Sequence, residues 1–393
     1  MRDKRFAIVI AAIVLCGHLL LSQVHARSKT AWRTVEVPFK SHDGYPMFGK
    51  LILPPSGPTR AVVMYVQTAE GATVDQKRKF GNMKTFSYFD IYREQLIPKN
   101  IGFFSYEGRG IFMGDEPPRF ETIDPNVYNT STLDNKVKDA LSAIAVLRQQ
   151  PGCKDVPLLL IGASEGTLLA TETASRQPDQ IAGLVLYGVM ATGLRETFEY
   201  MMSDGAFMQL CDAFDTNRDG KITEKEYEAD ARKFRKNNGL QNTSFSELDP
   251  DKDELITVAD MRIFKKPIID ATLNDDFDTL RAWSHTGAAL AVPENWFEDH
   301  FAHETMWTFL SVLDIPVGCF HGVKDLNAPV SAVRALEEKA KQAGKDKVEF
   351  HYFKYAEHTL LVSGYFFDGK IRPGHRRIFA FIDRVVKDAE SKK

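Results

Sequence analysis

Short apolar runs alternate with helix-like stretches over most of the chain. The runs at 61–66 and 101–106 lack the polar alternation of a half-exposed strand, a pattern typical of strands buried on both faces. Further strands are predicted at 34–39, 47–53, 157–161, 181–187, 315–320 and 348–353, and helices at 137–147, 168–174, 330–343 and 376–386. This order predicts an α/β fold with a mostly parallel sheet flanked by helices.

The alternation breaks at about residue 190 and resumes at about 312. The intervening segment is helical and charged, so we expect an insertion at 190–312 between two parts of one sheet domain, 27–189 and 313–393. Its tryptophans and phenylalanines between Trp283 and Phe309 either line a pocket or pack the insertion onto the sheet domain.

The first 26 residues have the composition of a signal peptide. A basic start (Arg2, Lys4, Arg5) precedes an apolar run at 6–21, and the small residue Ala26 suits cleavage. The alternative is an uncleaved anchor helix, but a run of about 16 residues is short of the roughly 20 that span a membrane. We therefore expect a secreted or periplasmic protein with no stable membrane span after cleavage.

Composition narrows the class of protein. With 393 residues, 44% hydrophobic and 26% charged, the chain is globular. The net charge of −3 is small, and nothing in the composition suggests binding to nucleic acid, which would require a basic face. Three cysteines follow the signal segment: Cys153, Cys211 and Cys319. Their odd number and wide spacing predict buried packing residues, not a disulfide framework or a zinc site.

The pentapeptide Gly-Ala-Ser-Glu-Gly at 162–166 directly follows a predicted strand and opens a predicted helix. Small residues two before and two after Ser164 permit the sharp turn of a nucleophile elbow. The serine would project from the end of the sheet at a helix N-terminus, whose dipole favours a nearby oxyanion.

A serine nucleophile needs a base, and the base needs an acid that orients it. Asp325 follows the strand at 315–320, and His358 follows the strand at 348–353. Both lie where strands of an open α/β sheet present their ligands. His375 is the remaining later candidate for the base, and His321 is expected to pack near the site.

These features resemble the α/β-hydrolase family over roughly 34–190 and 312–388. The resemblance implies that Ser164 is the nucleophile, His358 the general base and Asp325 the acid. It also implies that the turn containing Arg109 is structural.

The same resemblance implies an oxyanion hole built from two backbone N–H groups. One belongs to Glu165, and the other comes from the loop after the strand at 61–66. The family often has His-Gly there, whereas this chain has Gln-Thr-Ala, so Ala69 is expected to donate, or Thr68 in its place.

The segment 215–226 of the insertion matches a twelve-residue EF-hand calcium loop. Predicted ligands are Asp215, Asn217, Asp219, the carbonyl of Lys221 and the two oxygens of Glu226, and apolar helical faces flank the loop.

A second loop begins 34 residues later and departs from the pattern twice. Glu254 replaces the glycine, which costs backbone strain, and Asp260 replaces the terminal glutamate. We expect weaker calcium affinity there, or tolerance of magnesium; the alternative is a degenerate partner that only stabilises the first loop. The predicted ligands are Asp249, Asp251, Asp253, Leu255 and Asp260.

The EF-hand pair would occupy about 205–265 within a helical cap. Calcium would fold this cap, or alternatively gate the nucleophile. Ile222 and Ile256 hold equivalent positions, through which the loops should pair as short strands.

The sequence thus predicts a secreted serine hydrolase that cleaves a carboxylic ester, thioester or amide of a small molecule, acyl compound or peptide. A serine peptidase or acyltransferase on the same residues, or a non-catalytic calcium-binding scaffold, are the alternatives. Substrate and oligomeric state stay open.

Overall fold

A computed structural model describes the chain except residues 1–30, 69–72, 80–83, 238–239, 286–291 and 392–393. The predicted signal peptide and Ala69 therefore lie outside the described residues. By internal contacts the chain forms two units. One contains the sheet, and the other combines 192–303 with 324–330; we call the latter the inserted unit.

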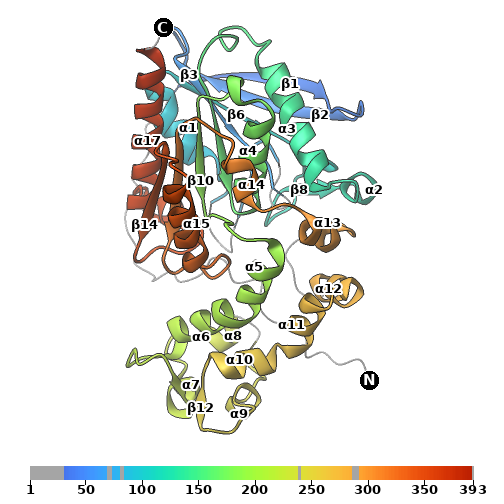
Figure 1. Ribbon diagram of the computed structural model, residues 1–393, viewed down its shortest axis with the longest axis vertical. Coiled ribbons are helices and arrows are strands. Elements are labelled where there is room, and N and C mark those ends of the chain that lie inside the picture. The colour runs from blue at the N-terminus through green and yellow to red at the C-terminus, as the bar shows by residue number, and fades with distance from the viewer. Residues whose placement is uncertain (1–30, 69–72, 80–83, 238–239, 286–291, 392–393) are drawn as a thin grey trace. The chain divides into compact units, whose positions relative to one another are not determined.

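The first unit is built on an eight-stranded sheet (Figure 1), which is mostly parallel as predicted. Only β2 runs against its neighbours, pairing antiparallel with β1 and β6, while the remaining pairs are parallel. In spatial order the strands are β1 (Arg33–Lys40), β2 (Pro46–Leu53), β6 (Ile101–Tyr106), β3 (Ala61–Tyr65), β9 (Leu158–Ala163), β10 (Gly183–Tyr187), β13 (Val317–Gly322) and β14 (Val348–Phe353).

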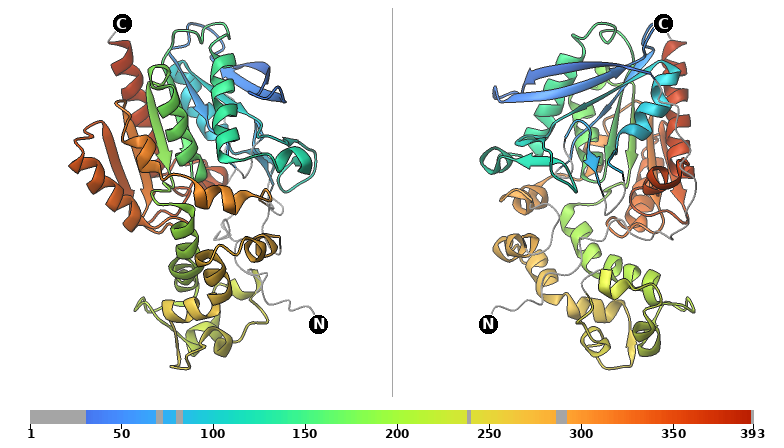
Figure 2. Two further views of the ribbon diagram at one scale, coloured as in Figure 1. Left: turned by 45° about the vertical axis from the view of Figure 1, so that its right-hand side comes forward. Right: turned by 180° about the vertical axis from the view of Figure 1, so that it is seen from behind.

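Helices cover both faces of this sheet (Figure 2). One face packs against α3 (Leu133–Leu147), α4 (Glu165–Arg176), α14 (Met306–Leu310) and α15 (Val330–Gln342). The other packs against α1 (Asp90–Leu96) and α17 (Pro373–Glu390). Strands such as β3 and β6 are buried at every residue, which explains their unbroken apolar sequences. Shorter elements of this unit are β4 (Lys77–Arg78), β5 (Phe86–Ser87), β7 (Ile111–Met113), β8 (Glu121–Ile123), α2 (Pro125–Tyr128) and α16 (Ser363–Asp368).

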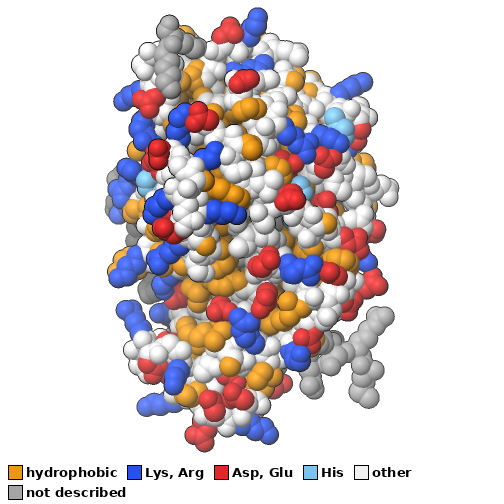
Figure 3. Space-filling model, in the orientation of Figure 1, with side chains coloured by type: hydrophobic (Ala, Val, Ile, Leu, Met, Phe, Trp, Pro, Cys, Tyr) orange, Lys and Arg blue, Asp and Glu red, His pale blue; other side chains and the backbone are white. Residues whose placement is uncertain are grey.

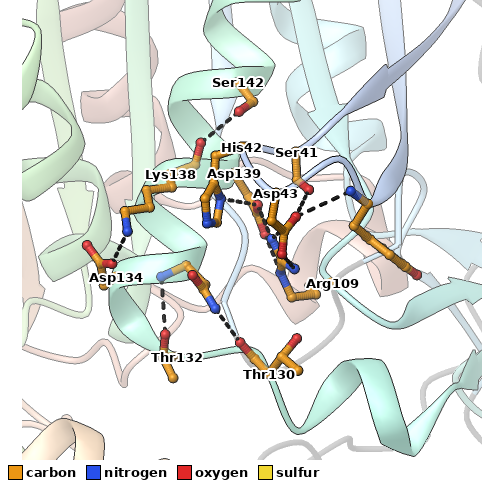
Figure 4. Close-up of polar contacts among 12 residues, drawn as sticks. Ser41, His42, Asp43, Arg109, Thr130, Thr132, Asp134, Lys138, Asp139 and Ser142 are labelled. Atoms are coloured by element: carbon orange, nitrogen blue, oxygen red, sulfur yellow. Dashed lines mark hydrogen bonds and ion pairs between the residues drawn. The ribbon is translucent and has the colours of Figure 1, made fainter.

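The turn after β6 is tied to α3 by a buried ion pair (Figure 4). The Arg109 guanidinium donates to both carboxylate oxygens of Asp139, at 2.7 and 3.0 Å, and also to Asp43 at 2.6 Å. Both Arg109 and Asp139 are buried, so each charge depends on the other for compensation. This arrangement agrees with the structural role expected of the Arg109 turn.

Tyrosine hydroxyls gather on the α1 and α17 face of the sheet. The hydroxyl of Tyr187 lies 3.1 Å from that of Tyr92, 3.3 Å from that of Tyr88 and 3.4 Å from that of Tyr65. The ring of His375 packs edge-on against Tyr187 and is fully buried. Burial lowers the pKa of His375 to about 4, against a smaller opposing effect of a backbone hydrogen bond with Leu360.

The inserted unit consists of short helices and one two-stranded ladder (Figure 1). Its elements are α5 (Leu194–Tyr200), a π-helical turn (Met201–Gly205), α6 (Ala206–Phe214), β11 (Ile222–Thr223), α7 (Glu224–Ala229), α8 (Phe234–Asn237), α9 (Phe245–Leu248), β12 (Leu255–Ile256), α10 (Val258–Phe264), α11 (Lys266–Leu273), α12 (Phe277–Ser284) and α13 (Trp296–Ala302). Phe297 packs against Phe198 in one of its apolar clusters, with Trp283, Trp296 and Phe301 alongside. These aromatic residues therefore pack within the inserted unit itself, whereas Trp307 and Phe309 belong to the sheet unit and pack against its core.

None of the helices in the described part of the chain is long and apolar enough to cross a membrane. Cys153 and Cys319 are buried free thiols, as predicted, and Cys211 is a partly buried one.

His375 predicts a loss of stability in acid. The folded state keeps its imidazole neutral down to about pH 4, whereas the unfolded chain protonates it near its ordinary value of 6.5. Between these values the unfolded state binds more protons, so stability falls as pH falls, by about 1.4 kcal/mol per pH unit from this group. Urea unfolding across that range should show a shallower loss for His375→Phe than for the wild type.

The exposed His285 offers a control, because His285→Phe should keep the wild-type pH dependence. An identical pH dependence in His375→Phe and the wild type would contradict this account.

Candidate active site

Ser164 sits in a strained turn between β9 and α4. Its φ of +54° and ψ of −126° lie outside the regions that serine normally occupies, at a cost of about 1–3 kcal/mol. It directly precedes the first residue of α4, and its carbonyl accepts the N–H of Thr167 at 2.9 Å and the Thr167 hydroxyl at 2.7 Å. The local geometry is therefore that of the predicted nucleophile elbow.

The two glycines of the pentapeptide are required by close approaches. A Cβ on Gly162 would lie 2.1 Å from the carbonyl oxygen of Gly166. A Cβ on Gly166 would lie 2.9 Å from Cγ2 of Thr68 and 3.2 Å from the carbonyl oxygen of Val66. The loop after β3 thus passes directly against the start of α4, and this places Thr68 beside the elbow.

Glu165, which follows the serine, is held by a buried ion pair. Its carboxylate accepts from Nζ of Lys136 on α3 at 2.8 Å, and both side chains are 8% exposed. This pair fixes the first turn of α4 to α3 and leaves the glutamate charge compensated.

His358 comes close to the serine turn through the neighbouring strand. The N–H of Ser164 donates to the carbonyl of Tyr187 at 3.1 Å, so the next residue, Gly188, lies beside the turn. A Cβ on Gly188 would stand 2.9 Å from Cε1 and 3.0 Å from Nδ1 of His358. The sheet unit therefore brings the predicted nucleophile and base to the same strand ends.

His321 packs inside the sheet unit. It is fully buried in β13, and its Nδ1 accepts the N–H of Val189 at 3.1 Å. His375 is also fully buried, within the tyrosine cluster described above.

Asp325 follows β13 by three residues and belongs to the inserted unit. It is buried, and its Oδ1 accepts the N–H groups of Asn327 at 2.8 Å and Ala328 at 2.9 Å. Within the inserted unit, the hydroxyl of Tyr200 donates to the Asp325 carbonyl at 2.8 Å.

The first calcium-type loop is organised by its own carboxylates. Asp215 accepts the N–H groups of Arg218 and Gly220, at 2.6 and 3.0 Å. Glu226 accepts from the hydroxyls of Thr216 and Thr223, each at 2.9 Å. The remaining predicted ligands, Asn217, Asp219 and Lys221, lie exposed along the same loop.

The second loop draws its acidic side chains together. Asp249, Asp251 and Asp253 each offer a carboxylate oxygen, and these oxygens lie within 4.8 Å of one another. Asp260 is fully buried, and among the described residues its Oδ1 has no hydrogen-bond partner. Figure 3 shows acidic side chains gathered at the end of the inserted unit that carries these loops.

The two loops adopt the same conformation despite their different sequences. Glu254 has a φ of +70° where Gly220 has +80°, which is the backbone strain expected of a glutamate at that position. Its N–H donates to Asp249 at 3.1 Å, as that of Gly220 does to Asp215. Ile222 pairs with Ile256 in the short ladder that the sequence predicts.

Comparisons with known proteins support the fold alone. No protein-family model matches the sequence, and no curated protein does either. The solved structure of DcsB in complex with its substrate analogue is 15% identical, with a TM-score of 0.50, over 91% of this chain and 99% of that one.

Two further solved structures have lower TM-scores. A lipase in its open form is 16% identical with a TM-score of 0.45, over 90% of this chain and 99% of that chain. The esterase EaEST from Exiguobacterium antarcticum is 15% identical with a TM-score of 0.44, over 89% of this chain and 99% of that chain. The strand order and the nucleophile elbow agree with the α/β-hydrolase fold predicted from the sequence.

Gly188→Ala should displace His358. The new Cβ would meet three atoms of the histidine at 2.8–3.0 Å and would also sit at a φ of +57°. We expect the free energy of unfolding to fall by about 1–3 kcal/mol and the imidazole to move. Urea unfolding and a crystal structure of the variant would test these two expectations.

Gly57→Ala is the matched control, because Gly57 also has a positive φ, +81°, but nothing within 4 Å of the added Cβ. Equal losses of stability in the two variants, with His358 unmoved, would show that the contact is unimportant.

Proposed function

We propose that this protein is a serine hydrolase that cleaves a carboxylic ester, thioester or amide through an acyl-enzyme on Ser164. The observation that carries the proposal is the strained serine at the N-terminus of α4 with His358 packed against Gly188 on the adjoining strand. A scaffold without catalysis would gain nothing from holding a serine at this cost.

In the proposed reaction, His358 takes the proton of the Ser164 hydroxyl while Oγ bonds to the substrate carbonyl carbon. The carbonyl oxygen becomes an oxyanion, which the N–H of Glu165 and a second N–H from Thr68 or Ala69 would stabilise. The bond from the carbonyl carbon to the leaving group then breaks as the imidazolium gives that group its proton, and the acyl group stays on Oγ. Water next attacks the acyl carbon while His358 takes its proton. The bond to Oγ breaks, His358 returns the proton to Oγ, and the acid leaves.

Asp325 is proposed to orient His358 and to stabilise the imidazolium. Its support is the position after β13 and a carboxylate already fixed by two backbone N–H groups. The signal-like segment at 1–26 supports secretion, and the substrate is proposed to be a small acyl compound or peptide.

Calcium is proposed as a structural ligand of the inserted unit. The residues present fit the ion, because hard cations prefer carboxylate oxygens and the second loop holds three of these within 4.8 Å, with the buried Asp260 near its end. The carbonyl of Leu255 would complete the ligands of the ion in the second loop. Another ion would bind in the first loop, held by Asp215, Asn217, Asp219, the carbonyl of Lys221 and Glu226. Bound calcium would neutralise the acidic loops and so stabilise this unit.

The enzyme proposal is tested by a fluorophosphonate probe. We expect one adduct on Ser164, identified by peptide mass spectrometry. The Ser164→Ala variant should form no adduct, and its rate of ester hydrolysis should be lower by about 10³-fold or more. Ser175→Ala, on the same helix, should keep wild-type labelling and hydrolysis. A wild-type protein without an adduct, or an adduct that persists in Ser164→Ala, would refute the proposal.

Calcium binding is tested by thermal unfolding with and without chelator. At 100 times the dissociation constant an ion that binds only the folded protein adds about 2.7 kcal/mol, so calcium should raise Tm by several degrees. Glu226→Gln should remove a large share of this calcium-induced increment, and the exposed neighbour Glu224→Gln should remove none. An unchanged wild-type Tm at millimolar calcium would exclude binding.

A further inference from the structure

The loop that carries His358 joins β14 to α16 in an unusual conformation. Leu360 and Leu361 have φ values of +57° and +62°, and both lie in the left-handed region that leucine rarely adopts. Leu360 is fully buried, so its side chain is anchored in the core beneath the loop. Such a conformation persists only where the surroundings fix it.

A single carboxylate gathers the donors of this loop. Oε2 of Glu357 accepts the N–H of Thr359 at 2.6 Å. Oε1 accepts the Thr359 hydroxyl at 2.6 Å and the N–H of Leu361 at 2.8 Å. The main-chain carbonyl of Glu357 accepts the N–H of Leu360 at 3.1 Å, so the three residues after His358 are all tied to the residue before it.

The bonding pattern requires a carboxylate. Both oxygens accept, and hydrogen bonds to a charged acceptor are shorter and stronger than neutral ones. A glutamine would present an NH₂ group to one set of these donors and would lose the bonds made there. The side chain is therefore matched to the loop and to its two left-handed residues.

We infer that Glu357 is a positioning residue for His358, an inference that rests on the proposed function. Its carboxylate holds the loop so that the imidazole stays against Gly188 beside the Ser164 turn. A general base must remain within hydrogen-bond reach of the proton it removes, and a displacement of about 1 Å can cost about 100-fold in rate. The sequence pattern assigns no role to Glu357.

Glu357→Gln should therefore slow chemistry and leave substrate binding unchanged. We expect kcat for an activated ester to fall about 10- to 100-fold with KM within about twofold of the wild type. The rate of fluorophosphonate labelling should fall in parallel, because it depends on the same activation of Ser164.

Thr359→Val gives a second, milder variant that keeps the Glu357 carboxylate and nearly keeps the shape of the threonine side chain. It removes only the hydroxyl donor, so we expect kcat to fall about two- to fivefold, again with KM unchanged. Its small change of shape keeps the test available if Glu357→Gln does not fold.

Asp368→Asn is the matched control. The Asp368 carboxylate also accepts a backbone N–H two residues ahead, that of Lys370 at 2.9 Å, but it lies on an exposed turn at the end of α16. Its kcat, KM and labelling rate should all equal those of the wild type.

The outcomes separate the two proposals. A wild-type protein that neither labels nor hydrolyses esters overturns the proposed function itself. A wild type that is active, with folded Glu357→Gln and Thr359→Val variants whose kcat and labelling rate stay within twofold of it, overturns the role of Glu357. The role of Glu357 is also overturned if KM rises while kcat is unchanged, so that kcat/KM falls by the same factor, because only substrate binding would then have changed.

Discussion

The parallel register of β9, β10 and β13 is the constraint on which the rest of the site depends. Ala163 pairs with Tyr187, so β9 and β10 end at one level, and Tyr187 pairs with Phe320, two residues before the end of β13. The N–H groups of Ser164 and Gly188 continue the ladder by one residue, donating to Tyr187 and Phe320. Because a slip of one residue would turn every buried side chain to the opposite face, the register cannot shift, and the serine turn is fixed with it.

That rigidity lets the site hold conformations that would not persist alone. Ser164, Leu360 and Leu361 all have positive φ, and each such residue costs about 1–3 kcal/mol. The helix that follows Ser164 buries Leu169 completely, and Leu360 is buried to the same extent. Burial of a leucine contributes about 1.5–3 kcal/mol, so the core next to each strained position offsets the strain.

The sheet could be predicted from the sequence because a strand buried on both faces leaves an unbroken apolar run. The elbow at Ser164 could be predicted because its pattern is local, as in the contact that requires Gly162, with the Gly166 carbonyl four residues later. The contacts that require Gly166, with Thr68 and Val66, come from the loop after β3 and could not be predicted. The pair between Glu165 and Lys136 could not, since it joins residues 29 apart that only the packing of α3 on α4 brings together. The contact of Gly188 with His358 is of the same long-range kind.

The calcium-type loops show a different limit of prediction. The sequence favoured the first loop, since Glu254 and Asp260 depart from the pattern in the second. Yet Glu254 accepts the left-handed conformation, and the carboxylates of Asp249, Asp251 and Asp253 converge. Hydrogen bonds from the loop backbone to Asp249 and Asp260 stabilise this arrangement. These bonds could not be predicted by comparing the sequence with the calcium-loop pattern one position at a time.

The position of Asp325 in the fold does not follow the linear domain boundaries expected from the sequence. The segment 324–330 follows a strand of the sheet but makes its contacts within the inserted unit. Tyr200 at the end of α5 bonds to the Asp325 carbonyl, and Lys324 pairs with Asp212 on α6, three residues before the first calcium-type loop. The proposed acid is therefore supported by the same helices that lead into the proposed calcium site, so a loss of structure there would also remove the support of Asp325.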